Sequence, residues 1–162
     1  MRRLASVVLT GVLLSACGGV TGPEGVLVLR TINGAGLPVI LRTGLSNQRH
    51  VISGTLELNG DNTYRVTTDW QREDASGIYP QPLGVASGTY IITGSTIEFI
   101  DSRFSSDTPQ FRYTGTVQGD QVTSNCGPFG VTPPIGELAL VYGRSAPVNG
   151  GVALDTLPRR NC

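Results

Sequence analysis

The chain has 162 residues, with 12 basic and 12 acidic side chains and a formal net charge of zero. That length suits one domain with a substantial core and excludes two ordinary domains. Every basic residue is an arginine, and loss of Arg2 and Arg3 with an N-terminal leader would leave ten against twelve acidic residues. A slightly acidic domain without a basic stripe is not expected to bind nucleic acid.

Residues 1–16 have the organisation of a secretory signal peptide. Arg2 and Arg3 form a short positive start, Leu4 to Leu14 is an apolar stretch, and small residues lead to Cys17. An apolar run of about 7–15 residues is too short to span a bilayer and is typical of an exported protein. We therefore expect residues 1–16 to be removed from the mature protein.

The end of this leader, Leu14-Ser15-Ala16-Cys17, resembles the lipobox of bacterial lipoproteins. The resemblance implies a diacylglycerol on the Cys17 thiol, cleavage before Cys17 and an acyl chain such as palmitate on the new amino group. Several acyl chains hold a protein on a membrane, whereas one binds only reversibly. Gly18 follows the cysteine, which implies the outer membrane in a Gram-negative cell. We expect a bacterial cell-envelope protein with residues 17–25 as a lipidated, Gly- and Pro-containing tether.

The mature chain shows a hydrophobic period of two, which is typical of half-buried antiparallel strands. Apolar residues alternate with polar ones in 51–58, 63–71 and 110–118. The side chains predicted to face inward are Ile52, Leu56, Leu58, Tyr64, Val66, Trp70, Phe111, Tyr113 and Val117. No window of comparable length shows the stripe of a helix.

Short turns with Gly, Asn or Asp separate these and further strand-like runs, for example Gly60-Asp61 and Gly119-Asp120. The further runs are 26–33, 37–43, 86–92, 96–101, 121–124 and 137–143. About nine strands joined mostly by short turns predict an all-β domain over residues 26–144, either a two-sheet sandwich or an up-and-down barrel. Longer loops are predicted at 72–85 and 125–136, followed by an unpatterned C-terminal tail at 145–162.

Several short motifs resemble a group of small, largely uncharacterised lipocalin-like bacterial lipoproteins. The motifs are Thr31 to Pro38, Gly60-Asp61-Asn62-Thr63-Tyr64, Ser87-Gly88-Thr89-Tyr90 with Gly94, Ile97 and Phe99, and Tyr113, Gly115, Gly119, Asp120 and Val122. The resemblance spans roughly residues 26–143. It implies a single antiparallel up-and-down barrel of about 8–10 strands, and it implies no established activity. A barrel also removes the exposed edges that an open sheet would leave.

No pattern in the chain predicts a catalytic or metal site. The single histidine, His50, is expected to be a solvated loop residue, because no nucleophile motif accompanies it. One histidine does not supply the His and Cys ligands of a typical zinc site. The carboxylates of Asp69, Glu73 and Asp74 are close together in the sequence and could serve calcium binding or acid–base chemistry, but the run around Glu73 is interpreted as an ordinary solvated loop. We expect no enzyme activity, no catalytic residue, no metal and no cofactor.

Two cysteines are left once Cys17 carries lipid. Cys126 and Cys162 form a candidate disulfide in an oxidising compartment, and the alternatives are two free thiols or a C-terminal cysteine that pairs elsewhere. Such a bond would close a loop of some 35 residues between positions 126 and 162. By the chain-entropy relation this would add about 3–4 kcal/mol.

Aromatic residues gather on the predicted inner face and suggest two functions. The set is Tyr64, Trp70, Tyr90, Phe99, Phe111 and Tyr113. These side chains could line a pocket for a small hydrophobic ligand, as in lipocalins, or they could simply fill the barrel. The hypotheses are therefore a ligand-binding envelope lipoprotein and, alternatively, a structural or protein-interaction lipoprotein with a solid core. In the second, the loops at 72–85 and 125–136 would contact an envelope protein.

Overall fold

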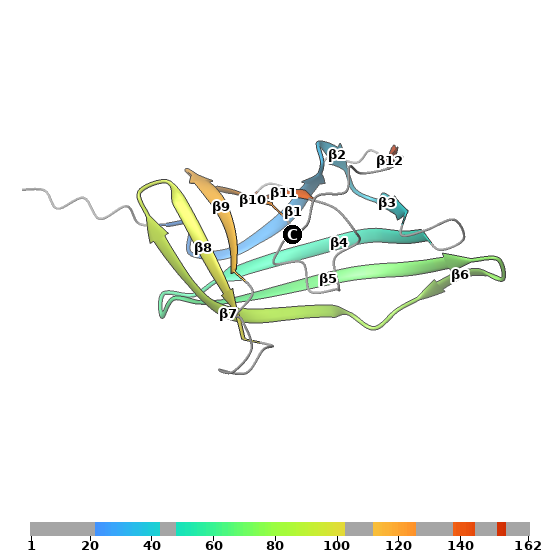
Figure 1. Ribbon diagram of the computed structural model, residues 1–162, viewed down its shortest axis with the longest axis horizontal. Helices are drawn as coiled ribbons and strands as arrows, with labels where there is room; N and C mark the ends of the chain where they lie inside the picture. The colour runs from blue at the N-terminus through green and yellow to red at the C-terminus, as the bar shows by residue number, and fades with distance from the viewer. Residues whose placement is uncertain (1–21, 43–47, 103–111, 126–137, 145–151, 155–162) are drawn as a thin grey trace, which may run out of the picture.

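The computed structural model describes residues 22–42, 48–102, 112–125, 138–144 and 152–154 (Figure 1). These residues form twelve β-strands and no helix. The strands are β1 (Gly25–Ile32), β2 (Ala35–Gly36), β3 (Val39–Arg42), β4 (Gln48–Leu58), β5 (Thr63–Asp74), β6 (Gly77–Pro80), β7 (Gly84–Thr93), β8 (Thr96–Asp101), β9 (Arg112–Gln118), β10 (Gln121–Asn125), β11 (Ala139–Gly143) and β12 (Val152–Leu154). The prediction of an all-β fold is confirmed.

Eight of these strands form a closed antiparallel barrel. Hydrogen-bonded neighbours run in the order β4-β1-β11-β10-β9-β8-β7-β5, and β5 pairs again with β4 to close the ring. Each barrel strand pairs with the next barrel strand along the chain, and β1 pairs with β11 at the seam, where Leu29 lies opposite Tyr142. This is an up-and-down barrel of the lipocalin-like type that the sequence predicts, and the two-sheet alternative is wrong.

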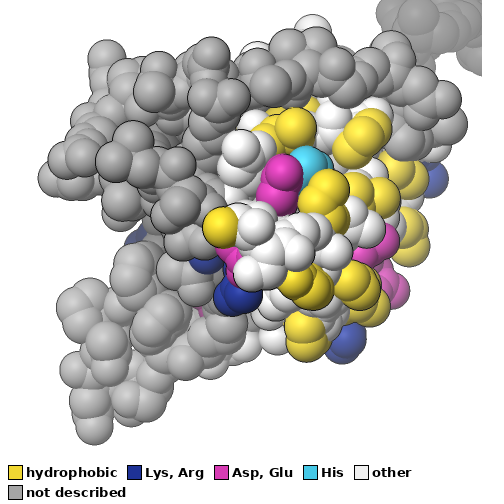
Figure 2. All heavy atoms as spheres, turned by 90° about the vertical axis from the view of Figure 1, so that its right-hand side faces the viewer, with side chains coloured by type: hydrophobic (Ala, Val, Ile, Leu, Met, Phe, Trp, Pro, Cys, Tyr) yellow, Lys and Arg dark blue, Asp and Glu magenta, His cyan; other side chains and the backbone are white. Residues whose placement is uncertain are grey.

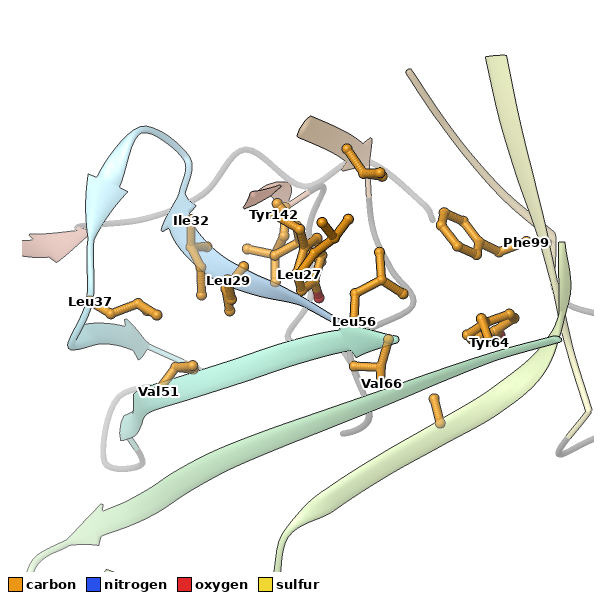
Figure 3. Close-up of a cluster of buried hydrophobic side chains, with 14 of the residues drawn as sticks. Leu27, Leu29, Ile32, Leu37, Val51, Leu56, Tyr64, Val66, Phe99 and Tyr142 are labelled. Carbon is orange, nitrogen blue, oxygen red and sulfur yellow. The ribbon is translucent and has the colours of Figure 1, made fainter. Parts of the chain in front are cut away.

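The core consists of alternate residues of the barrel strands. Leu27 and Leu29 of β1 are fully buried and face Leu56 and Val66 of β4 and β5 (Figure 3). The intervening residues lie on the outer surface, as the pleat of a strand requires. Burying one such side chain stabilises the fold by about 1.5–3 kcal/mol. One continuous cluster of twenty buried hydrophobic residues draws on seven of the eight barrel strands, and β9 packs against it through the partly buried Tyr113 and Val117.

The β4–β5 hairpin is longer than the barrel. Its turn-side half pairs with β1 and β7, but its other half pairs with β3 and β6 instead. We call this second part, residues 39–42, 48–52, 69–74 and 77–80, the sheet extension. It runs to the right of the barrel in Figure 1. The short strand β12 pairs with β3 in parallel, within the segment 145–162 that was predicted to have no pattern.

A β-bulge in β4 changes which residue faces inward. The pairing register shifts between Val51 and Ser53, so that Val51 lies opposite Trp70 and Ser53 opposite Asp69. Val51 is consequently 1% exposed, whereas Ile52 is only partly buried. The prediction that Ile52 faces the core is wrong, because strict alternation cannot anticipate the extra residue of a bulge.

The predicted loop 72–85 is largely strand. Its first residues complete β5, residues 77–80 form β6, and β7 already begins at Gly84. A turn at Ala75 and Ser76 connects β5 to β6, and the Ser76 N–H donates a hydrogen bond to the Asp74 carboxylate (2.9 Å). The prediction of a long irregular loop here is therefore wrong.

Candidate functional site

The barrel interior contains most of the aromatic residues predicted to face inward. Tyr64, Tyr90 and Phe99 are 1%, 5% and 0% exposed, and the Tyr64 and Phe99 rings meet edge to face with centroids 5.1 Å apart. Trp70 and Tyr113 are partly buried and pack against the same cluster. Phe111 lies outside the described residues. The described aromatic side chains thus fill space between strands by contacting one another and the surrounding aliphatic residues.

Four polar side chains accompany this cluster. Thr68, Asp101 and Ser124 are at most 1% exposed, and the Tyr142 ring is fully buried. Burial raises the pKa of the Tyr142 phenol, because removing the phenolate from water is unfavourable. The Tyr90 hydroxyl donates to the Asn59 carbonyl (2.9 Å), and burial followed by the charges of Glu24 and Asp61 raises its pKa. These phenols are therefore neutral structural groups near pH 7.

The lipid site and the candidate disulfide cannot be placed in the fold. Cys17, Cys126 and Cys162 all lie outside the described residues. The assignments of Cys17 to lipid and of the other two cysteines to a disulfide stay predictions.

The outer face of the sheet extension holds the single histidine. His50 is in β4, not in a loop, and its Nε2 lies 2.6 Å from Glu73 Oε2 on β5. The side chains are 16% and 36% exposed. The expectation of a solvated loop histidine is wrong, because β4 begins at Gln48 and its cross-strand neighbour supplies a carboxylate. In Figure 2 the histidine lies against an acidic side chain, with hydrophobic side chains above and to the right and white atoms to the left and below.

The opposite face of the extension combines arginine and aromatic residues. The Arg49 guanidinium lies 5.2 Å from the centroid of the Trp70 ring, within the range of a cation–π interaction. Burial lowers the pKa of Arg49. The Trp70 indole N–H donates to the Pro82 carbonyl (3.1 Å), which connects β5 to the segment before β7. Arg72 pairs with Asp74 (2.8 Å), so the residues predicted to form a solvated acidic loop are an ordered part of β5.

Exposed hydrophobic side chains are concentrated on β6 of this extension and on the segment that leads from it into β7. Among the described residues, six large hydrophobic side chains are exposed, and four of them lie in positions 78–85. Ile78, Tyr79, Leu83 and Val85 are 52%, 40%, 59% and 38% exposed. We call these four residues the apolar strip; Ile78 and Tyr79 are consecutive in β6, so their side chains lie on opposite faces of this edge. Ile78 lies opposite Glu73 and Val85 opposite Thr67, six residues apart on β5, so the strip is about 20 Å long.

The outer edge of β6 is unsuited to adding another strand. Within the described residues β6 pairs only with β5. Its last residue is the exposed Pro80, which has no N–H to donate to a neighbouring strand. A partner would therefore contact side chains of the apolar strip rather than extend the sheet.

A second surface feature is a groove of about 690 Å³ on the barrel wall, where β4, β5, β7 and β8 meet. Its lining residues are Glu57, Asn59, Thr63, Tyr64, Arg65, Ser87, Gly88, Thr89, Ile100, Asp101 and Ser102. Gly88 lies opposite both Tyr64 and Asp101 in the two neighbouring strands. The absence of a side chain there lets β8 approach β7 closely. No motif in the sequence predicted this groove.

Groups suited to metal binding are not found in the part of the chain that the structure describes: no three His, Cys, Asp or Glu side chains converge there. The described residues also contain no helix with the length and apolar character needed to span a membrane.

Comparison with protein-family models, curated proteins and solved structures finds no match for this chain. The lipocalin-like lipoprotein group therefore stays a resemblance of motifs and barrel architecture.

Proposed function

We propose that the mature chain is a lipid-anchored envelope lipoprotein whose barrel is a rigid protein-interaction module. The observation that carries this proposal is the apolar strip, since clustered exposed hydrophobic side chains on a soluble domain are typical of contact surfaces. The strip runs from β6 of the sheet extension to Val85 on the barrel strand β7, and both strands are hydrogen-bonded to β5, which supplies a stiff support.

The packing of the barrel supports this function over ligand binding. Tyr64, Phe99 and the leucines around them contact one another within one buried cluster, as expected of a small barrel filled by its own side chains. A small hydrophobic ligand inside the barrel stays a prediction, which a ligand extracted with the purified protein would support.

The point where the tether joins β1 and the far end of the apolar strip lie at opposite ends of the β4–β5 hairpin. Gly25, where the tether joins β1, lies opposite Leu58 beside the hairpin turn, whereas Ile78 lies opposite Glu73 near the far end. The eight peptide steps from Cys17 to Gly25 can span at most about 28 Å. A lipid on Cys17 would therefore keep the turn end of the hairpin within about 28 Å of the membrane.

Site-specific photo-crosslinking in the native cell tests the proposal. A photoreactive residue in place of Leu83 should give one reproducible protein adduct, which Ile78→Ser should weaken. The matched control position is Ile91, which is 51% exposed on the barrel wall away from the strip. Equal adducts from positions 83 and 91, or none from position 83, would contradict the interaction role. Separately, an intact mass that retains Met1 would contradict the lipid anchor.

A further inference from the structure

We infer that the groove beside Gly88 is a binding site for a neutral, hydroxyl-rich ligand of the oligosaccharide class. This inference concerns the barrel wall and does not depend on the apolar strip or on the lipid anchor. The groove has a volume of about 690 Å³, which lies within the range of small-molecule sites.

The first argument is a pair of opposite charges that do not engage each other. Glu57 and Arg65 lie directly opposite in the β4–β5 register, and both line the groove. No ion pair or hydrogen bond of either side chain is found among the described residues. On the next part of the wall, by contrast, Arg112 and Glu98 form an ion pair of 2.7 Å. The groove thus offers one donor group and one acceptor group that are open to a ligand.

Three hydroxyl-bearing side chains, two on β7 and one just after β8, also line the groove. Thr89 and Ser102 are exposed, and Ser87 is partly buried. The Ser102 hydroxyl donates to the Ser87 carbonyl (2.7 Å), which orients it beside the strand. Hydroxyls both donate and accept, so together with a carboxylate and a guanidinium they match the neighbouring hydroxyl groups of a sugar.

The lining argues against other classes of ligand. An anion would meet the Glu57 carboxylate beside the only arginine of the groove. A metal ion is disfavoured because no three candidate ligands converge among the described residues. A purely apolar ligand would remove both charges of Glu57 and Arg65 from water without pairing them, which is unfavourable.

Affinity should be modest, since the groove has no exposed aromatic ring on which a sugar could stack. Tyr64 is the only aromatic residue of the lining and is 1% exposed. We therefore expect a Kd near 1 mM, of the order at which a few exposed hydrogen bonds hold a ligand.

Amide NMR titration of the full-length mature protein, kept in a detergent without a sugar headgroup, tests the inference. The probes are cellobiose, chitobiose and maltotriose, with inorganic phosphate as the anion arm. At least one sugar should shift the amides of Ser87, Thr89 and Ser102 saturably. Arg65→Ala and Glu57→Gln should each weaken that binding by about tenfold, the effect of one charged hydrogen bond.

Two variants of the engaged ion pair are the controls. Arg112→Ala and Glu98→Gln make the same chemical changes on the outer wall but outside the groove, and should leave the sugar affinity unchanged. Three outcomes would overturn the inference: no saturable shift with any sugar up to about 20 mM, an equal loss in the control variants, or binding of phosphate in preference to the sugars.

Discussion

Replacement of Gly88 by alanine should destabilise the barrel strongly. A Cβ atom at position 88 would lie 1.9 Å from the Ile100 carbonyl oxygen and 2.9 Å from its carbonyl carbon. Carbon and oxygen approach each other to only about 3.3 Å in weak contacts between strands. The clashing group is a backbone carbonyl, which cannot rotate away as a flexible side chain could. Strand β8 would therefore have to move away from β7 by more than about 1 Å.

The cost follows from what this movement breaks. Two ladder hydrogen bonds near the Gly88–Asp101 pair would be lost, at about 1 kcal/mol each. Strain from the inserted methyl group adds about 1–3 kcal/mol. We expect a loss of about 3–5 kcal/mol, a large part of the 5–15 kcal/mol typical of a domain. With a urea m-value near 2 kcal/mol/M, the midpoint should fall by about 2 M.

Urea unfolding followed by fluorescence of Trp70, the single tryptophan, measures this effect. Gly60→Ala is the matched control, because the nearest atoms to its Cβ are the Glu24 carboxylate oxygens, the closer at 3.5 Å. That change should alter stability by no more than about 0.5 kcal/mol. A Gly88→Ala midpoint equal to that of Gly60→Ala would refute the close approach of β7 and β8.

Two further predictions concern the core. Phe99→Ala should cost about 3–5 kcal/mol, because Phe99 is 0% exposed and its ring contacts Tyr64; a loss below about 1 kcal/mol in urea unfolding would contradict its central packing. Burial raises the pKa of Tyr142, so the unfolded chain loses this proton near pH 10 while the folded chain keeps it. The stabilisation is present below about pH 10 and declines at higher pH. Tyr142→Phe should flatten that decline between about pH 9 and 11, whereas Tyr79→Phe, at an exposed tyrosine, should not; equal slopes would contradict the assignment.

The sequence predicts the barrel strands well because their evidence is local. Alternation in 63–71 predicts that Tyr64 and Val66 face inward, and both are buried. Turn residues such as Asp61 also mark real turns: the Thr63 N–H and hydroxyl both donate to its carboxylate, which lowers the pKa of Asp61. Period and turn chemistry thus suffice wherever a strand pairs with its neighbour along the chain.

The errors occur where pairing partners change along a strand. Ile52 lies at the bulge where β4 leaves β1 and joins β3, and no local pattern announces that exchange. The same applies to His50, whose partner Glu73 is on the far end of a hairpin that exceeds the barrel. The groove depends on four strands at once, so it could not be predicted from spacing. One signal was available for β6: the apolar Ile78 and Tyr79 follow a turn-forming Asp74-Ala75-Ser76-Gly77 segment.

The seam between β1 and β11 determines when the barrel can form. All other barrel pairings join strands that are consecutive in the ring and along the chain, but Ile32 must find Leu140 near the other end of the chain. Hairpins can assemble during synthesis, whereas closure waits for the last barrel strand, and such distant contacts form slowly. Under the proposed export, a chain moving through a secretion channel would consequently remain unclosed, and therefore able to thread, until β11 had emerged on the far side.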